Sequence, residues 1–282
     1  MSGKLYVCAT PIGNLKDITL RCLETLKEVD LIASEDTRHT IKLLNHYEIK
    51  VPLESYHENN KDTKGKKLIN LLLEGKNIAL VSDAGMPGIC DPGEDLIKLC
   101  YENEIEVTVL PGATASITAL ILSGIKTRSY CFEGFLPSNK KAKKEVIQRI
   151  KNDTRTYIIY EAPHHLLQTL KELYDNIGNR NIAIVKELTK KYENVFKTSI
   201  IDALAYFENN TPKGEYVLVI EGAKEEDILN EQKEQINNIT IKEHLNQYVS
   251  KGMDIKEAMK KVAKDRGISK RDVYNEIKVL KI

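Results

Sequence analysis

The first half of the chain alternates between short apolar runs and amphipathic segments. The apolar runs have the length and composition of buried strands and cover residues 4–9, 29–34, 77–82 and 105–110. Apolar residues recur at helical spacing between them, in residues 18–29, 39–47, 62–75 and 94–103. Residues 114–124 are apolar nearly all round, which predicts a buried helix. Strands that alternate with helices indicate an α/β fold with a mostly parallel sheet, covered on both faces.

A second set of strands and helices begins near residue 126. Four further strands are predicted at residues 130–135, 156–162, 181–187 and 215–222. Helical spacing lies between them at residues 143–150, 164–177 and 199–209. We therefore expect two α/β domains, over residues 1–124 and 125–223.

The remainder of the chain carries no strand signal. Residues 224–239 are polar and predict a linker, and residues 240–282 predict a small helical module resembling a helix-turn-helix. Ser269 and Asp272 have the spacing of a capping box directly after Gly267, which marks the start of the last helix.

Composition and charge narrow the possible partners. The 282 residues carry 42 Lys and Arg against 41 Asp and Glu, so a uniformly cationic nucleic-acid binder is excluded. Positive charge is instead local: residues 138–155 hold seven basic residues against two acids, and residues 240–282 hold eleven against six. Each segment can meet a polyanion, although a solvated helix face accounts for either one equally well.

Other sequence patterns predict a cytoplasmic protein without a metal. The N-terminus lacks the pattern of a signal peptide, and the five cysteines form no CxxC pair, so free thiols in a reducing compartment are expected. The sequence contains no GxGxxG, P-loop or HExxH motif, which argues against nicotinamide binding, P-loop phosphoryl transfer and a zinc-protease site.

Glycine and proline concentrate in the loops that follow predicted strands. These loops are residues 9–14, 83–93, 110–116 and 133–137. Because parallel strands end at the same edge of a sheet, such loops meet where α/β proteins bind ligands. Glycine allows the backbone to approach a ligand closely, so we expect a small-molecule site built largely from backbone groups. Ordinary tight turns remain the alternative for any single loop.

Charged residues also stand at the strand ends. Asp36 and Arg38 follow the second strand, and Glu187 and Lys190 follow the strand at 181–187. Carboxylates there can orient a polar substrate or take a proton, and the cations can hold an anion. An N-cap role explains Asp36 equally well.

Eight motifs occur together in order: TPIGNLKDIT, ASEDTRHT, LVSDAGMPGICDPG, LPGATA, FEGFLP, YEAPH, KELTK and KGEYVLVIEG. With them, residues 4–223 resemble the tetrapyrrole methylase superfamily, and most closely its branch that methylates small-subunit ribosomal RNA. The resemblance implies two α/β domains with a cofactor cleft between them, distinct from a Rossmann fold, and a homodimer.

The resemblance also implies S-adenosylmethionine as cofactor and supplies its candidate contacts. These are Pro11, Ile12, Gly85, Met86, Pro87, Ile89, Thr114, Ala115, Glu161, Ala162 and either Tyr216 or Val217. Met86 departs from the pattern, because a polar residue is expected at that position.

The reaction that the resemblance implies is methylation of a cytidine ribose 2′-hydroxyl in the decoding region of 16S rRNA. Asp36 and Glu187 are candidates for the base or orienting group, and Arg38 and Lys190 for phosphate or ribose anchors. RNA contacts are expected at Lys140, Lys141, Lys143, Lys144, Lys270 and Arg271. The alternatives are a methyltransferase of the same fold acting on a porphyrinoid or protein, and a ribosome-binding factor without catalysis.

Overall fold

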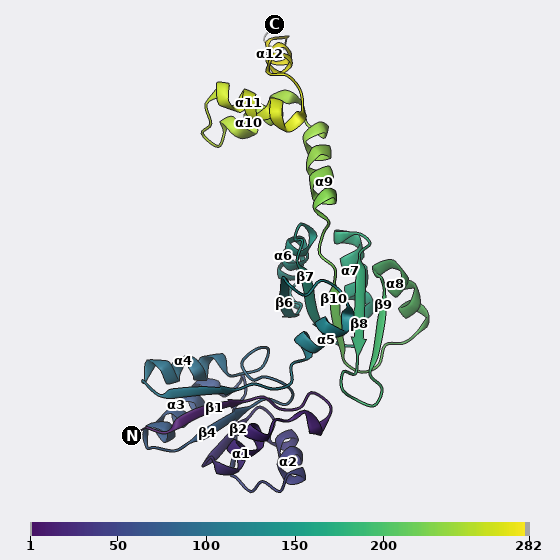
Figure 1. Ribbon diagram of the computed structural model, residues 1–282. Coiled ribbons are helices and arrows are strands. Elements are labelled where there is room, and N and C mark those ends of the chain that lie inside the picture. The colour runs from purple at the N-terminus through teal and green to yellow at the C-terminus, as the bar shows by residue number, and fades with distance from the viewer. Residues whose placement is uncertain (1, 280–282) are drawn as a thin grey trace. The chain divides into compact units, whose positions relative to one another are not determined.

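The structure is a computed structural model that describes residues 2–279, without the side chains of residues 231–233, 235, 237, 278 and 279. It divides into two compact units. Unit 1 comprises residues 1–151 and 155–221, and unit 2 comprises residues 152–154 and 222–282. Both β-sheets belong to unit 1, and the last four helices belong to unit 2 (Figure 1).

The first sheet has five strands in the order β3-β2-β4-β1-β5, and all neighbours pair in parallel. The strands are β1 (Lys4–Cys8), β2 (Leu31–Ser34), β3 (Leu53–Ser55), β4 (Ile78–Val81) and β5 (Glu106–Leu110). This is the parallel arrangement that the alternation of apolar and amphipathic segments predicts. All four residues of β4 are buried, as expected for a central strand with both faces covered.

Helices cover both faces of this sheet (Figure 1). On one face, α1 (Leu20–Glu28) and α2 (Thr37–His46) pack against Ile32 of β2. On the other, α3 (Lys61–Leu73) and α4 (Glu94–Glu102) pack with Ala33 of the same strand. Successive residues of a strand point to opposite faces, so Ile32 and Ala33 serve two separate apolar clusters. A short 3-10 helix, Leu15–Asp17, precedes α1.

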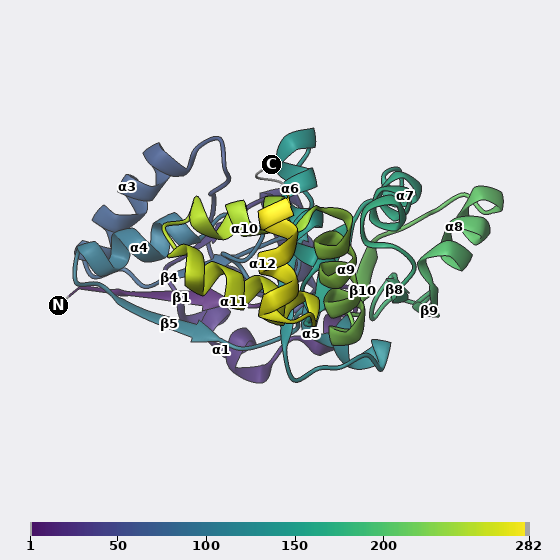
Figure 2. The same ribbon diagram turned by 90° about the horizontal axis from the view of Figure 1, so that it is seen from above.

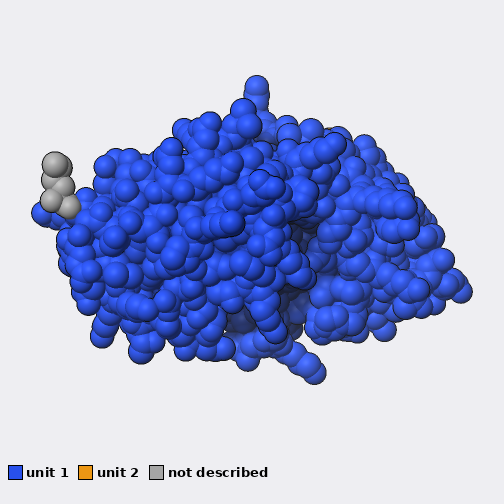
Figure 3. Space-filling model, turned by 90° about the horizontal axis from the view of Figure 1, so that it is seen from below, with its two compact units in different colours: residues 1–151, 155–221 blue, residues 152–154, 222–282 orange. Residues whose placement is uncertain are grey.

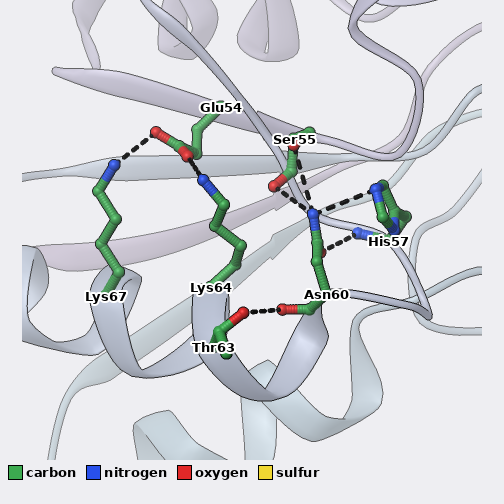
Figure 4. A network of polar contacts seen from close by, with 7 residues as sticks. All are labelled: Glu54, Ser55, His57, Asn60, Thr63, Lys64 and Lys67. Atoms are coloured by element: carbon green, nitrogen blue, oxygen red, sulfur yellow. Dashed lines mark hydrogen bonds and ion pairs between the residues drawn. The ribbon is translucent and has the colours of Figure 1, made fainter.

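The edge strand β3 was not predicted, because its three residues are too short to show an alternating pattern. It is held to α3 by polar contacts, which Figure 4 shows. Glu54 of β3 forms ion pairs with Lys64 and, at 2.7 Å, with Lys67. Asn60 adds a hydrogen bond from its Nδ2 to the Ser55 carbonyl oxygen at 3.2 Å.

The second sheet has the order β6-β7-β10-β8-β9, with β6 and β7 parallel and the other neighbours antiparallel. Its strands are β6 (Tyr130–Phe135), β7 (Thr156–Glu161), β8 (Asn181–Lys186), β9 (Asn194–Ser199) and β10 (Tyr216–Ile220). The edge strand β9 was also not predicted. One face is covered by α6 (Lys140–Lys151), α7 (Leu166–Ile177) and α8 (Ile200–Asn209).

The opposite face of the second sheet is covered by α5 (Ala115–Ser123). Ala119 and Leu120 of this helix pack with Val217 and Val219 of β10. The helix thus precedes the expected boundary at residue 124 in sequence, but packs against the strands that follow it. The space-filling view shows a hollow between the parts of unit 1 that the two sheets form (Figure 3).

Unit 2 consists of α9 (Glu225–Asn238), α10 (Ile241–Val249), α11 (Ile255–Arg266) and α12 (Lys270–Val279). The last three share a small apolar core that includes Leu245, Val262 and Val273. Residues 224–239, expected as a linker, form α9, whose three acids in the first turn favour a helix there. The capping box before α12 is confirmed: Asp272 N donates to Ser269 Oγ at 3.1 Å, and Ser269 N donates to Asp272 Oδ2 at 3.2 Å.

Candidate functional site

The loops after β1 and β4 are joined by a two-way backbone bridge. Thr10 N donates to the Gly85 carbonyl oxygen at 2.9 Å, and Gly85 N donates to the Thr10 carbonyl oxygen at 3.0 Å. After β1 the chain continues to β2, towards one edge of the sheet, and after β4 it continues to β5, at the other edge. The direction in which strands are added therefore reverses between the neighbours β1 and β4. This reversal is where open α/β sheets bind ligands. Two of the expected cofactor loops therefore meet at the expected edge.

The loop after β5 completes this cradle through two close backbone approaches. Gly85 has a φ of +84°, and a Cβ on it would lie 3.3 Å from Ile12 Cγ2 and 3.6 Å from the Ala113 carbonyl oxygen. A Cβ on Gly112 would lie 2.7 Å from Ala9 Cβ. Glycine is favoured at Gly85 because of its positive φ, and it is required at Gly112 because a Cβ there would clash with Ala9. Thr114 and Ala115 then open α5.

The cofactor candidates of the second sheet lie against the same region. Ile12 and Ala115 both pack against the apolar cluster that contains Val217. Tyr160 of β7 accepts a hydrogen bond on its Oη from Ser116 N at 3.1 Å. Glu161 is buried, and its Oε1 accepts from Ala162 N at 2.9 Å. Val217 and Tyr216 are both buried in β10.

Three candidates in the loop after β4 differ in their surroundings. The Met86 side chain packs against the apolar cluster under α3 and α4, which explains an apolar residue where a polar one was expected. Pro87 is buried, whereas Ile89 is 61% exposed. Ile89 therefore lies at the open side of the loop.

Glu187 and Lys190 lie on a turn after β8 that docks against the loop after β1. Glu187 and Thr189 have φ values of +50° and +63°, a conformation that costs free energy for residues other than glycine. A Cβ on Gly13 would lie 2.6 Å from Lys190 Cγ and 2.7 Å from Thr189 Oγ1. Sequence reasoning did not single out Gly13, and its only signal was its place in a glycine-containing loop.

Glu187 and Lys190 also form a charged network with Glu215. Lys190 Nζ lies 2.7 Å from Glu215 Oε2 and 3.2 Å from Glu187 Oε1. The backbone N–H of Glu215 donates to Glu187 Oε1 at 3.0 Å and, with Lys190, lowers the pKa of Glu187. Partial burial is the largest single influence on Lys190 and opposes its charge, but the hydrogen bonds and charges of Glu215 and Glu187 together outweigh it, so the pKa of Lys190 is raised.

Asp36 and Arg38 form a bidentate pair at the start of α2. Asp36 accepts from the backbone N of Arg38 at 2.8 Å and is thus the N-cap, while Arg38 Nε and Nη2 donate to its two oxygens at 3.0 and 2.7 Å. These bonds from Arg38 lower the pKa of Asp36 to about 2. The Arg38 side chain is 88% exposed, so it presents its remaining donors to solvent.

Further carboxylates surround this pair, and of these Asp83 and Asp91 were not predicted as site residues. Asp36 N donates to Asp83 Oδ1 at 3.1 Å, which ties the end of β2 to the loop after β4. Burial, together with Asp91 and Asp83, raises the pKa of Glu35. Burial also raises the pKa of Asp91. Among the described residues, no group of three His, Cys, Asp or Glu side chains is placed to hold a metal ion.

The basic candidates divide into engaged and exposed side chains. Lys143 Nζ is 2.7 Å from Glu172 Oε2 and donates to Thr169 Oγ1 at 3.2 Å, so it fastens α6 to α7. Lys140, Lys141 and Lys144 are exposed on the same helix. In unit 2, Lys270 and Arg271 are exposed in the first turn of α12. None of the described helices combines the length and the apolar character that a membrane span requires.

Comparisons with known proteins place this fold and sequence in a family. A family model described as Tetrapyrrole (Corrin/Porphyrin) Methylases matches residues 4–203. The chain is 48% identical over 273 residues to a ribosomal RNA small subunit methyltransferase I of Bacillus subtilis, covering 97% of this chain and 93% of that protein. A protein of the same name from Halalkalibacterium halodurans is 47% identical over 273 residues, with 97% and 94% covered.

A shorter relative bears on the role of unit 2. The ribosomal RNA small subunit methyltransferase I of Thermotoga maritima is 44% identical over 220 residues, which are 78% of this chain but 99% of that protein. Its whole length is thus close to that of unit 1 alone. Among solved structures, the methyltransferase CobJ has a TM-score of 0.61 at 17% identity and covers 79% of this chain and 95% of that chain.

Proposed function

Because the chain belongs to the tetrapyrrole methylase family, we propose that it is a methyltransferase that uses S-adenosylmethionine to methylate small-subunit ribosomal RNA. The target that we propose is the 2′-hydroxyl of a cytidine ribose in the decoding region of 16S rRNA. The observation that carries the proposal is the near-complete match, at 47% and 48% identity, to relatives named as methyltransferases of small-subunit ribosomal RNA. We further propose a cytoplasmic homodimer.

The residues at the carboxyl edge of the first sheet fit S-adenosylmethionine. Gly85 and Gly112 allow the loops after β1, β4 and β5 to approach one another closely, so the cradle is built largely from backbone. Ile12, Ala115 and Val217 supply apolar contacts beside them. Such a mixture of backbone polar groups and apolar side chains suits a nucleoside that carries an amino acid. The bound cofactor would supply an electrophilic methyl group on a sulfonium centre.

The charged residues at this edge can align the nucleophile. The low pKa values of Asp36 and Glu187 keep both as carboxylates at neutral pH but make them weak bases. Both also use their oxygens to hold a neighbouring cation. We therefore favour the orienting role over the proton-accepting role for each. Alignment of the hydroxyl with the methyl group is the larger part of catalysis in such a displacement.

Arg38 and Lys190 suit the recognition of RNA phosphate or ribose oxygens. Asp36 engages Nε and Nη2 of Arg38, so the Nη1 donors remain free for a phosphate in a fixed orientation. A fixed guanidinium loses little side-chain entropy when a phosphate binds. Lys190 pairs with Glu187 and Glu215, and its side chain is less exposed than that of Arg38. We therefore assign Lys190 a contact to the ribose.

Transfer of a labelled methyl group from S-adenosylmethionine to purified small ribosomal subunits tests the proposal. We expect label in the 16S rRNA when the subunits come from cells that lack this enzyme, and little incorporation when they come from cells that contain it. Label in ribosomal protein, or transfer to uroporphyrinogen instead of RNA, would favour the alternatives of a protein or porphyrinoid substrate. No transfer, with tight binding to the subunit, would favour the non-catalytic factor.

A further inference from the structure

Phe135 presents an aromatic ring to solvent at the end of the outermost strand of the second sheet. It is the last residue of β6 and is 59% exposed, although the chain contains only four phenylalanines. A single exposed apolar side chain is common on protein surfaces, so the surroundings of this ring decide whether it has a role. The question is which partner the ring would contact.

The ring is held in place rather than free to move. Its centroid lies 5.7 Å from that of Tyr160 in an edge-to-face arrangement, and Tyr160 also packs in this way against Phe132 at 4.9 Å. The Tyr160 hydroxyl is fixed by the hydrogen bond from Ser116 N at 3.1 Å. Because edge-to-face packing uses only part of the Phe135 ring, the rest remains open to a planar partner.

The strand end that carries Phe135 touches the candidate cofactor loop. The register of β6 against β7 shifts between Phe132 and Gly134, and Gly134 has a φ of +63°. A Cβ on Gly134 would lie 3.1 Å from Cys90 Sγ. Cys90 follows Ile89, the exposed cofactor candidate, directly in sequence. The aromatic ring therefore lies beside the loop that would hold the methyl-donating cofactor.

A basic surface lies on the other side of the same strand end. Lys141, Lys144, Gln148 and Arg149 of α6 line an open depression of about 470 Å³, together with Glu145. Arg149 Nη2 joins the helix to β6 by an ion pair with Glu133 at 3.1 Å. Neither Lys141 nor Lys144 forms an ion pair within the part of the chain that the structure describes.

The sheet geometry brings the ring and the basic surface to one edge. The helix α6 follows β6 after a connection of four residues and packs on the face of Tyr157 and Ile159. Tyr160, with the rings of Phe132 and Phe135, belongs to the opposite face. Since β6 is the outermost strand, only its end separates the two surfaces. A single nucleic-acid strand can pass over that end and contact both.

We propose that Phe135 is a platform on which an unstacked base of the RNA substrate lies, while Lys141 and Lys144 hold the phosphates of neighbouring nucleotides. This inference rests on the proposed function and adds where the RNA binds. Single-stranded RNA is recognised by stacking of bases on aromatic rings and by cations along its backbone. A base stacked at Phe135 fixes its ribose beside the cofactor loop.

The test measures the KM for small ribosomal subunits, the kcat of methyl transfer and the Kd for S-adenosylmethionine. Phe135→Leu keeps an apolar side chain but removes the ring, and should raise the KM between about five- and 150-fold, the range that base stacking gives. The Kd for S-adenosylmethionine should not change. Phe135→Tyr keeps the ring and should restore the KM to within about twofold of wild type. Lys141→Gln with Lys144→Gln should raise the KM and reduce its dependence on salt.

Tyr101→Leu is the matched control, because Tyr101 is a similarly exposed ring on α4, and its substitution should leave the KM unchanged. An unchanged KM in Phe135→Leu, with active wild-type enzyme, would overturn the platform but not the proposed function. A change of oligomeric state in Phe135→Leu, measured by light scattering, would also overturn it, because the ring would then belong to a subunit interface. Wild-type enzyme that transfers no methyl group to RNA would overturn both proposals.

Discussion

Asp36 and Arg38 show how one pair of residues serves both the fold and the candidate site. The Asp36 carboxylate caps α2 and at the same time fixes the guanidinium of an exposed arginine. The sequence allowed Asp36 to be either the N-cap of a helix or a site residue. The structure shows that it is the N-cap of α2, and this role leaves a role in the site open. Because the side chains are exposed, their pairing adds little to the stability of the fold. Its value is the fixed direction of the Arg38 donors.

Titration of Asp36 tests this pairing. The pKa of about 2 is below the ordinary value of about 3.9, so the folded chain keeps the carboxylate charged to a lower pH than the unfolded chain does. Any stability from the pair is therefore present above about pH 3.9 and lost as the pH falls towards 2. In Arg38→Gln, we expect the midpoint of the Asp36 carboxyl signal in NMR to rise towards its ordinary value.

Asp30 is the internal control for that titration. The Asn77 backbone and Lys76 lower its pKa, and both lie away from Arg38 in sequence and in contacts. Its midpoint should be the same in Arg38→Gln and in the wild type. An Asp36 midpoint that also stays unchanged would contradict the pairing.

At the scale of elements, the central strands and most helices were predictable, and two edge strands and one helix were not. The strand at β4 is buried on both faces, so its sequence is a plain apolar run. By contrast, β3 and β9 are edge strands with no fully buried residue, and their sequences carry no such run. The helix α9 is polar and was expected as a linker, because composition alone does not separate an exposed helix from a coil.

The contacts between loops were also beyond prediction. The glycines in the four loops indicated a ligand site, but which loop touches which depends on tertiary packing. The docking of Gly13 on the turn at Glu187–Lys190 joins segments about 175 residues apart in sequence. Likewise, the apolar surroundings of Met86 are visible only in the folded chain.

Gly13→Ala tests whether the turn after β8 supports the cofactor loop. The added Cβ would lie 2.8 Å from the Leu188 carbonyl oxygen, so the backbone must move. Overpacking of this kind costs about 1–3 kcal/mol. We expect a lower melting temperature and weaker binding of S-adenosylmethionine in isothermal titration calorimetry.

Gly65→Ala is the matched control for this substitution. Gly65 lies within α3, where a Cβ would meet two side chains and no backbone, Leu99 Cδ1 at 3.3 Å and Tyr56 Cε2 at 3.9 Å, and alanine favours a helix by up to about 1 kcal/mol. Its affinity for S-adenosylmethionine should match the wild type. If Gly13→Ala also binds the cofactor normally, the turn does not support the loop.

At the scale of the whole molecule, unit 2 has its own apolar core, and its residues 240–282 hold eleven basic residues against six acids. The Thermotoga maritima relative is about as long as unit 1, which is consistent with a separable role for unit 2. We expect deletion of residues 240–282 to leave the affinity for S-adenosylmethionine unchanged and to weaken binding to the small ribosomal subunit. The loss should be largest at low salt, because fewer phosphate contacts flatten the salt dependence.

The truncated chain is measured by calorimetry with the cofactor and by sedimentation with the subunit. Loss of cofactor binding in a folded truncation would contradict a separate RNA-contact module. Unchanged subunit binding at all salt concentrations would show that unit 1 alone holds the RNA.

The most direct test of the central claim is the chemical position of the transferred methyl group. Subunits from cells that lack the enzyme are methylated in vitro, and the 16S rRNA is then cleaved with alkali, which requires a free 2′-hydroxyl. We predict one new alkali-resistant linkage, after a cytidine in the decoding region, that depends on both enzyme and S-adenosylmethionine. A methyl group on a base, or an unchanged alkaline cleavage pattern in labelled RNA, would contradict ribose methylation.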